Sequence, residues 1–202
     1  MPSPALRSRA VLLIIDMIND LEFPGNEELV GMSETLGKDV AKLKAKCRRA
    51  GIPAIYVNDN VGLWRSDFQG LIRRCMASKS AGRNMVRQIR PDSRDLLILK
   101  PAHSAFYGTP LVPLLTDMQV TSILLAGVLT HFCILLTAAD GYMRNFQLYV
   151  PEDCVAGRST DEHHAALQVM KSSFRIDITP SRNLDLSKIK RNSRVAAQTK
   201  TR

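Results

Sequence analysis

The sequence contains no C-x-x-C pair, no glycine-rich phosphate-binding motif and no long apolar run. Because its four cysteines are widely spaced, we expect free thiols and not a disulfide framework. The missing G-x-G-x-x-G and Walker motifs argue against a nucleotide site. The apolar run Ala10–Ile15 has six residues, whereas a signal-peptide core needs about 7–15 and a membrane-spanning helix about 20. The sequence therefore predicts a cytoplasmic protein without a membrane span.

Acidic residues are scarce in two segments, whose combined positive charge is larger than the formal charge of +9 of the whole chain. Residues 187–202 hold six Lys and Arg side chains and no acid, and residues 65–100 hold nine basic and three acidic side chains. Aromatic residues make up 5% of the chain and none lies among the basic residues of 187–202, so a stacking platform for single-stranded nucleic acid is missing. We expect a domain at 1–186, a flexible basic tail at 187–202 and no nucleic-acid partner.

What the sequence does contain is a repeated alternation of short β-branched apolar runs with longer helical patterns. The runs lie at 11–15, 53–57, 96–99, 122–126, 147–150 and 175–178, and the helical patterns at 33–50, 69–89, 109–118, 131–145 and 160–173. Nearly continuous apolar runs are typical of parallel strands that are covered on both faces. The pattern predicts an α/β fold, a three-layer α/β/α sandwich with a mostly parallel, Rossmann-like six-stranded sheet.

Reactive side chains stand where three of these runs end. Asp16 follows the first run, Lys100 follows the third, and Cys133 lies in the segment after the fourth. In an open α/β sheet, ligands bind beyond the carboxyl ends of the strands. A carboxylate, an ammonium and a thiol can therefore converge at one edge of the sheet. There the ammonium would keep the acid ionised while the acid accepts the thiol proton, which is how a nucleophile is activated.

Each of these residues also has an ordinary structural interpretation. Asp16 can cap a turn, Lys100 can extend along the rim of the sheet, and Cys133 can be a buried core residue. The functional interpretation has physical support as well. Cys133 opens a helical pattern, where the helix dipole and unpaired N–H groups lower the pKa of a thiol. The apolar run before Asp16 should raise the pKa of that carboxyl toward the range of a useful base.

Three blocks of the sequence resemble the cysteine hydrolases of the isochorismatase-like superfamily, which includes nicotinamidases and N-carbamoylsarcosine amidases. The blocks are LIIDMIND at 13–20, KPAHSAF at 100–106 with TPL at 109–111, and GVLTHFC at 127–133 with TAA at 137–139. They occur in the order of the family, each at a predicted strand end. The similarity covers roughly residues 10–180.

The resemblance implies a catalytic triad in which Asp16 is the general base, Lys100 its electrostatic partner and Cys133 the nucleophile. It also implies a cis peptide bond between Val128 and Leu129, which aims the N–H groups of Leu129 and Cys133 at the substrate oxygen. The implied reaction is hydrolysis of a small-molecule amide or carbamoyl substrate through a thioester acyl-enzyme. Members of the superfamily commonly form homo-oligomers, so a dimer or larger assembly is expected.

Two other functions stay open. Isochorismatase-type vinyl-ether hydrolysis uses the aspartate to protonate an enol ether and needs no thiol, so the intact Cys133 counts against it. A non-catalytic binding protein that engages a partner with its basic tail is the other alternative, and the complete set of three reactive residues counts against it.

The sequence departs from the metal-dependent branch of the superfamily. Nicotinamidases carry an Asp-x-His metal motif after the second strand, whereas this chain reads Asn58-Asp59-Asn60 there and has no histidine before His103. We therefore expect no catalytic metal and no cofactor.

Aromatic and basic residues are the remaining candidates for contacts with the substrate. An aromatic residue lines the pocket in the family, and Trp64 and Phe106 are the matching residues, although ordinary core packing is the alternative for both. The basic residues of 65–95 can attract an anionic substrate, but a solvated helix face is favoured. The pair His163 and His164 is also interpreted as part of a solvated helix face.

Overall fold

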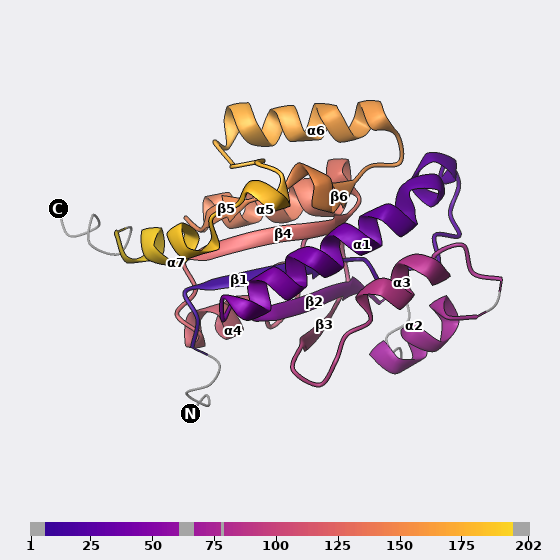
Figure 1. Cartoon of the computed structure of the whole chain (residues 1–202), viewed down its shortest axis with the longest axis horizontal. Coiled ribbons are helices and arrows are strands. Elements are labelled where there is room, and N and C mark those ends of the chain that lie inside the picture. The colour runs from indigo at the N-terminus through magenta and orange to yellow at the C-terminus, as the bar shows by residue number, and fades with distance from the viewer. Residues whose placement is uncertain (1–6, 61–66, 78, 196–202) are drawn as a thin grey trace.

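A parallel six-stranded sheet forms the centre of the molecule, with helices on both faces (Figure 1). The computed structural model describes residues 7–60, 67–77 and 79–195, with side chains up to Lys190. The strands are β1 (Ala10–Ile15), β2 (Ala54–Asp59), β3 (Leu96–Lys100), β4 (Ser122–Val128), β5 (Gln147–Tyr149) and β6 (Val155–Ala156). Their order is β3-β2-β1-β4-β5, with β6 pairing the end of β4, and every pairing is parallel. The predicted α/β class is confirmed.

The helices divide the hydrophobic core into two halves. They are α1 (Glu27–Arg49), α2 (Phe68–Cys75), α3 (Arg83–Ile89), α4 (Leu111–Asp117), α5 (Leu135–Met143), α6 (Thr160–Ser173) and α7 (Leu186–Val195). Apolar side chains of α1, α2, α3 and α7 pack on one face of the sheet, and those of α4, α5 and α6 on the other. Within the described chain, no helix is long and apolar enough to cross a membrane.

Strand β1 contributes to both halves of the core. Leu12 and Ile14 point into one half, while Leu13 and Ile15 point into the other, because successive side chains of a strand face opposite sides of the sheet. All of its residues are fully buried. This explains why the sequence of β1 is continuously apolar and stops abruptly at a charged residue.

Two elements differ from the sequence prediction. The helical pattern at 69–89 forms two helices, α2 and α3, because the chain turns between them to bring Gly82 against the loop that follows β1. The run at 175–178 is not a strand, and the sixth strand is β6. Since β5 has only three residues, the segment beside it pairs at one point, where Asp177 bridges to Tyr149.

Helix α7 occupies the start of the segment that the composition predicts to be a flexible tail. Its Leu186 and Ile189 are buried in the core, and Lys190 Nζ donates to the carbonyl of Ala50 at 2.6 Å. This part of the segment is therefore packed on the domain, because two apolar residues on one face of the helix bind it there. Residues 196–202 lie outside the described residues, and the domain boundary at 186 stays a prediction.

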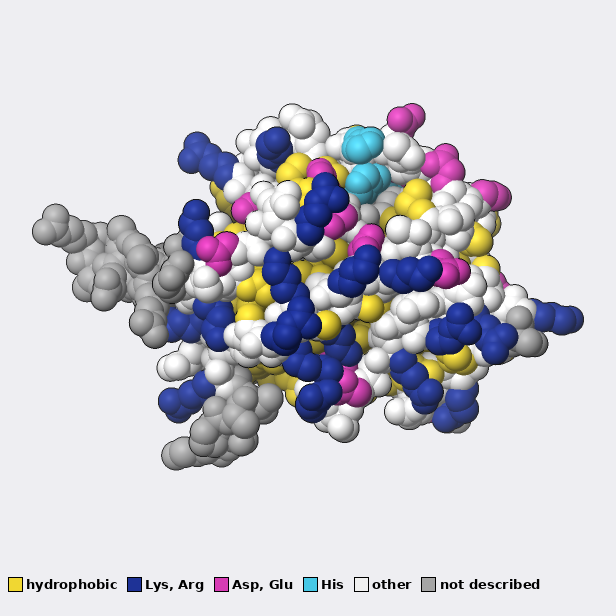
Figure 2. Space-filling model, viewed as in Figure 1, with side chains coloured by type: hydrophobic (Ala, Val, Ile, Leu, Met, Phe, Trp, Pro, Cys, Tyr) yellow, Lys and Arg dark blue, Asp and Glu magenta, His cyan; other side chains and the backbone are white. Residues whose placement is uncertain are grey.

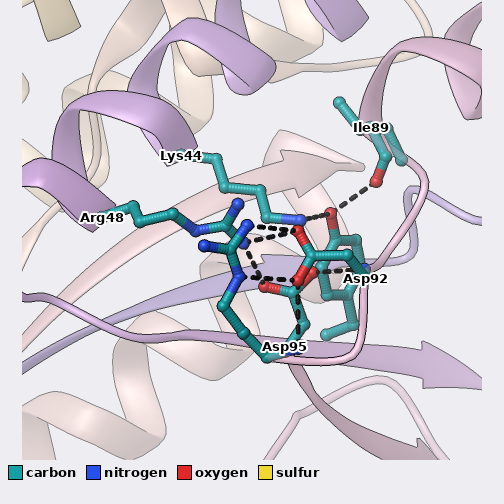
Figure 3. A network of polar contacts seen from close by, with 7 residues as sticks. Lys44, Arg48, Ile89, Asp92 and Asp95 are labelled. Atoms are coloured by element: carbon teal, nitrogen blue, oxygen red, sulfur yellow. Dashed lines mark hydrogen bonds and ion pairs between the residues drawn. The ribbon is translucent and has the colours of Figure 1, made fainter.

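A partly buried polar network fastens α1 to the edge of the sheet where β3 begins (Figure 3). Lys44 Nζ donates to the carboxylate of Asp95 and, at 3.0 Å, to the hydroxyl of Tyr56. Arg48 Nη2 lies 2.8 Å from Asp92 Oδ2 and 3.2 Å from Asp95 Oδ1. These charges satisfy one another, so the network has a structural role far from the edge where the strands end.

Candidate active site

Asp16 stands at the end of β1, where the chain turns with a φ of 52°. Its backbone N–H donates to the carbonyl of Val57 at 3.0 Å, and its Oδ1 accepts a hydrogen bond from the N–H of Asp59 at 2.7 Å. Both partners are main-chain groups of β2. The carboxylate is therefore held at a fixed position beside the end of the neighbouring strand.

Lys100 ends β3 and reaches the same carboxylate across β2. Its side chain is fully buried, and its Nζ lies 2.8 Å from Asp16 Oδ2 and 3.8 Å from Asp59 Oδ2. The ammonium also donates to the carbonyl of Ala102 at 3.1 Å. A charge taken out of water needs such compensation, because an unpaired buried ammonium would lose its proton or unfold the protein.

Cys133 completes the group from the end of β4. The peptide bond between Val128 and Leu129 is cis, at the position that the family resemblance specifies, and Thr130–Ile134 then forms a π-helical turn that leads into α5. Cys133 Sγ lies 3.7 Å from Lys100 Nζ and beside the carboxylate of Asp16, whose charge acts on it. The ends of β1, β3 and β4 thus bring the three predicted residues together.

Burial controls the ionisation of this group. It raises the pKa of the Cys133 thiol to about 12. The negative charge of Asp16 raises this pKa further, and the positive charge of Lys100 lowers it. Burial also raises the pKa of Asp16, against the attraction of Lys100. Burial alone would lower the pKa of Lys100, but the charges of Asp16 and Cys133 outweigh it and the pKa is raised.

The expectation that a helix N-terminus lowers the thiol pKa is therefore wrong. Cys133 lies on a tight π-turn ahead of α5 and faces a carboxylate in a dry environment, so the loss of solvation exceeds any gain from the helix dipole. Near neutral pH the resting site holds a neutral thiol beside a charged lysine.

A cleft of about 640 Å³ opens above these residues. Its described walls come from the loop after β1, the end of β2, Arg74 of α2, and the segment that carries Val128, Leu129 and Cys133. This volume falls within the range of small-molecule sites, about 300–1,000 Å³. The reactive group is thus accessible to a small ligand, although Cys133 itself is only 9% exposed.

The loop after β1 is anchored on three sides. Ile18 exchanges two hydrogen bonds with the amide of Asn58, from its N–H at 3.1 Å and to its carbonyl at 2.9 Å. The N–H of Gly82 donates to the carbonyl of Asp20 at 2.9 Å, and Arg74 Nη2 lies 2.9 Å from Asp20 Oδ2. The wall of the cleft that this loop forms is therefore rigid.

The two aromatic candidates have different outcomes. Phe106 is buried in the core, where its ring stacks on Phe146 with centroids 5.9 Å apart, and it is not among the described residues that line the cleft, so its contact with a substrate stays a prediction. The physical reason for its burial is local, because the N–H of Ala105 donates to Thr137 Oγ1 at 3.0 Å and this bond fastens the segment to α5. Trp64 lies outside the described residues.

Two contacts were missed by the sequence analysis. Arg74 is exposed, as expected for a solvated face, but it stands at the cleft and pairs with Asp20. His163 is partly buried, and its Nδ1 lies 2.9 Å from the hydroxyl of the fully buried Thr130, which starts the turn of Cys133. In both cases the partners are distant in sequence, and no spacing or composition signals the contact.

The described residues contain no group of three or more His, Cys, Asp or Glu side chains that could hold a metal ion. At the place where the metal-dependent relatives have their motif, the amide of Asn58 is committed to Ile18. The residues present at this position do not fit a metal site.

Comparisons with known proteins identify the family and the fold. The family model for the isochorismatase domain matches residues 10–180. The uncharacterised isochorismatase family protein YaaI of Bacillus subtilis is 38% identical over 168 residues, which cover 83% of this chain and 92% of YaaI. The isochorismatase of Bacillus subtilis is 28% identical over 80% of this chain, and the match spans 52% of that longer protein.

A solved structure shares the fold along nearly its whole length. The N-carbamoylsarcosine amidase of Thermoplasma acidophilum superimposes with a TM-score of 0.64 and 26% identity, covering 88% of this chain and 99% of the amidase. The family match, the similarity to YaaI and the shared fold lead to one conclusion. The chain belongs to the isochorismatase family and is a hydrolase.

Proposed function

We propose that this protein is a cysteine-dependent amidohydrolase that cleaves a small amide or carbamoyl compound through a thioester. The observation that carries the proposal is the position of Cys133, whose thiol lies 3.7 Å from Lys100 Nζ and is acted on by the charge of the Asp16 carboxylate that this lysine pairs with, beside an open cleft. A carboxylate that accepts a thiol proton and an ammonium that stabilises the resulting charge are what a neutral cysteine needs to become a nucleophile.

In the first half of the proposed reaction, Cys133 Sγ forms a bond to the substrate carbonyl carbon while its proton passes to Asp16. The carbonyl oxygen becomes an oxyanion, and the N–H groups of Leu129 and Cys133 are the proposed donors to it. Val128 and Leu129 line the cleft next to the thiol, which supports this assignment. The C–N bond then breaks, and the leaving nitrogen takes the proton from Asp16 and departs as ammonia or an amine.

In the second half, water attacks the thioester carbon and gives a proton to Asp16. The C–S bond breaks, the acid product leaves, and the sulfur recovers its proton from Asp16. Lys100 stays protonated throughout and offsets the charge that moves between Asp16 and Cys133. Because the thiol is neutral at rest, proton transfer and attack are coupled in this scheme.

The relatives support two reaction types. The amidase from Thermoplasma acidophilum is named for cleavage of a carbamoyl compound, and the Bacillus subtilis relative for isochorismatase activity. Vinyl-ether hydrolysis needs an acid and no nucleophilic sulfur, so the contact between Cys133 and the Asp16–Lys100 pair favours the amidase chemistry.

The test is ammonia release from a panel of primary amides, ureido acids and carbamoyl compounds, followed by mass spectrometry of the protein mixed with the slowest substrate. We expect an acyl adduct on Cys133, and Cys133→Ala should lose activity by about 10³-fold or more. Cys47→Ala, which changes a buried cysteine of α1 away from the cleft, is the matched control and should stay active. Full activity of Cys133→Ala without an adduct would overturn the proposal in favour of acid catalysis alone.

A homo-oligomer and a cytoplasmic location also belong to this proposal. Large apolar side chains are exposed around one groove on the α5 side of the molecule, with Tyr107 67%, Met143 68% and Leu136 41% exposed. A patch of this kind supports self-association. Light scattering of the purified protein should report a dimer or larger species, and a monomer at all concentrations would contradict this part of the proposal.

A further inference from the structure

The two neighbouring histidines near the start of α6 have different surroundings. His163 is partly buried, whereas His164 is exposed, and their rings lie 5.2 Å apart. Histidine side chains lie close together on the face of the molecule that Figure 2 shows, where α6 lies in Figure 1. Since successive residues of a helix point in different directions, one member of the pair turns toward the protein. That member contacts the π-helical turn Thr130–Ile134, which carries Cys133.

His163 contacts this turn at a buried hydroxyl. Its Nδ1 lies 2.9 Å from Oγ1 of Thr130, which is fully buried three residues before Cys133. A neutral imidazole has one donor and one acceptor nitrogen, and a hydroxyl can both donate and accept, so either tautomer of the ring can form the hydrogen bond. Burial and the neighbouring His164 lower the pKa of His163, which keeps the ring neutral near neutral pH. The hydrogen bond is therefore present in the resting enzyme.

A second contact joins the same two segments. His131 follows Thr130, and its Nε2 lies 3.5 Å from Oε2 of Glu162, the residue before His163. Glu162 is held in turn by Arg158, whose Nη2 donates to its Oε1 at 2.8 Å. Two consecutive residues of the turn thus meet two consecutive residues of α6.

The strand before α6 also runs along the strand before the turn. Strand β6 pairs with the last two residues of β4, Gly127 and Val128. The contacts of α6 continue this pairing beyond the ends of the two strands. The segment 155–163 therefore lies along the segment 127–133, and His163 is its contact nearest to the thiol in sequence.

The start of α6 is itself held in place. The carboxylate of Glu28 in α1 accepts hydrogen bonds from the N–H of Thr160 at 3.0 Å and from its hydroxyl at 3.3 Å. Gly157 packs so closely on this end of the helix that a Cβ placed on it would lie 3.0 Å from the backbone nitrogen of His163 and 3.2 Å from its Cβ. His163 therefore offers Thr130 a fixed partner.

We propose that His163 is a positioning residue of the hydrolase, which holds the turn of Cys133 in the geometry for attack through its hydrogen bond to Thr130. His163 is not among the described residues that line the cleft, so it acts on the thiol through the turn. Without this bond the turn has more freedom, and a nucleophile whose position varies attacks more slowly at the same ligand affinity. The effect on turnover rests on the proposed cysteine mechanism, whereas the order of the turn can be measured without a substrate.

Hydrogen exchange measures the order of the turn. The N–H groups of Phe132 and Ile134 both donate to the carbonyl of Leu129, at 3.0 and 3.1 Å, so their exchange reports the opening of the turn. In His163→Ala we expect both amides to exchange about tenfold faster or more, relative to the amides of β1, which report global unfolding. His164→Ala is the matched control and should exchange like the unmodified protein. No acceleration in the turn, or an equal acceleration in β1, would overturn the proposal.

Two conservative variants separate the hydrogen bond from a merely structural role. The amide of asparagine places a polar atom about where Nδ1 of histidine lies, whereas the amide of glutamine lies one bond further out. His163→Asn should therefore keep kcat within about threefold, and His163→Gln should lose about tenfold in kcat with little change in KM. Helix propensity alone predicts the opposite order, since glutamine is the better helix former. A higher kcat in His163→Gln than in His163→Asn would overturn the proposal.

A double variant tests whether the effect passes through Thr130, with kcat measured on the amide that releases ammonia fastest. His163→Ala and Thr130→Val remove the two ends of one bond, so the kcat of the double variant should equal that of the slower single variant. A loss equal to the product of the two single losses would overturn the proposal. If the unmodified protein hydrolyses no amide and Cys133 is never acylated, the proposed function fails, and the exchange rates alone decide whether His163 orders the turn.

Discussion

Lys100 Nζ lies 2.8 Å from Asp16 Oδ2 in a place where the lysine is fully buried. Each residue supplies the charge that makes the burial of the other tolerable, and Cys133 adds a third group that can lose or gain a proton. The pair is therefore both a structural element and the proposed machinery for moving the thiol proton. Changes to either member should affect stability and activity together.

Lys100→Met should cost about 3–5 kcal/mol in the free energy of unfolding, because it leaves the buried Asp16 without its counter-charge. Asp16 would then take up a proton at neutral pH, and amidase activity should be lost. Denaturant unfolding and ammonia release measure the two effects. Lys42→Met is the control, since Lys42 forms an exposed pair with Asp39 and should change stability by less than about 0.5 kcal/mol. Equal stability of the two variants would contradict the prediction.

The pH dependence of thiol alkylation should report the raised pKa of Cys133. With a pKa of about 12 in the folded protein, the thiolate fraction and hence the rate with iodoacetamide should rise about tenfold per pH unit from 7 to 10, without a plateau. Asp16→Asn removes a charge that helps to raise this pKa, so it should speed alkylation at pH 8 while hydrolysis is lost. A plateau below pH 8 in the unmodified protein would indicate a preformed thiolate and contradict the coupled mechanism.

The kcat/KM of hydrolysis should begin to fall with decreasing pH well above the ordinary pKa of an aspartate. Burial raises the pKa of Asp16, and the reaction needs its ionised form. As the pH falls through this raised value the base is protonated, and kcat/KM should fall with it. A profile that stays flat down to the ordinary pKa of a solvated aspartate would argue against Asp16 as the base.

Gly82→Ala should destabilise the protein by about 1–3 kcal/mol, because the new methyl group would lie 1.9 Å from the carbonyl oxygen of Asn19 and force two backbone segments apart. Gly31→Ala provides the contrast. Gly31 is within α1 and a Cβ there meets nothing within 4 Å, so this change should stabilise the helix by about 0.5–1 kcal/mol. Thermal unfolding of both variants tests this contrast. A change in stability of the same sign in the two variants would be inconsistent with the packing described.

Thr130→Val removes the hydroxyl that contacts His163 Nδ1 and should lower stability by about 1–3 kcal/mol, since a partly buried ring nitrogen loses its partner. The turn that carries Cys133 is then held less firmly, so we expect kcat to fall about tenfold with little change in KM. Thr116→Val changes an exposed threonine of α4, whose hydroxyl donates to the carbonyl of Val112, and should leave both quantities unchanged. Unaltered kcat in Thr130→Val would show that this contact does not position the thiol.

The sequence predicted the parts of the site that follow from strand order. Asp16, Lys100 and Cys133 each follow an apolar run, and parallel strands that share a sheet end at the same edge, so their convergence could be expected before the structure was known. The strand β6 could not be predicted, because it has only two residues and two residues show no periodicity. The run at 175–178 has the composition of a strand but lies beside a short partner.

Other features depend on contacts between distant segments. Arg74 is exposed, as predicted for a solvated helix face. Only the fold, however, places Asp20 next to it. The aromatic Phe106 matched the family pattern, yet the bond from Ala105 to Thr137 holds its segment on α5 and turns the ring into the core. The sign of the thiol pKa change also depended on burial, which a helix position alone does not specify.

The hydrogen bond from the N–H of Asp59 to Asp16 Oδ1 has an evolutionary consequence. Since the donor is a main-chain group, every amino acid except proline at position 59 can supply it. The side chain there, which lines the cleft, is thus not needed for this hydrogen bond. Descendants of this protein can exchange residue 59 to suit a new ligand and still inherit this main-chain bond to Asp16.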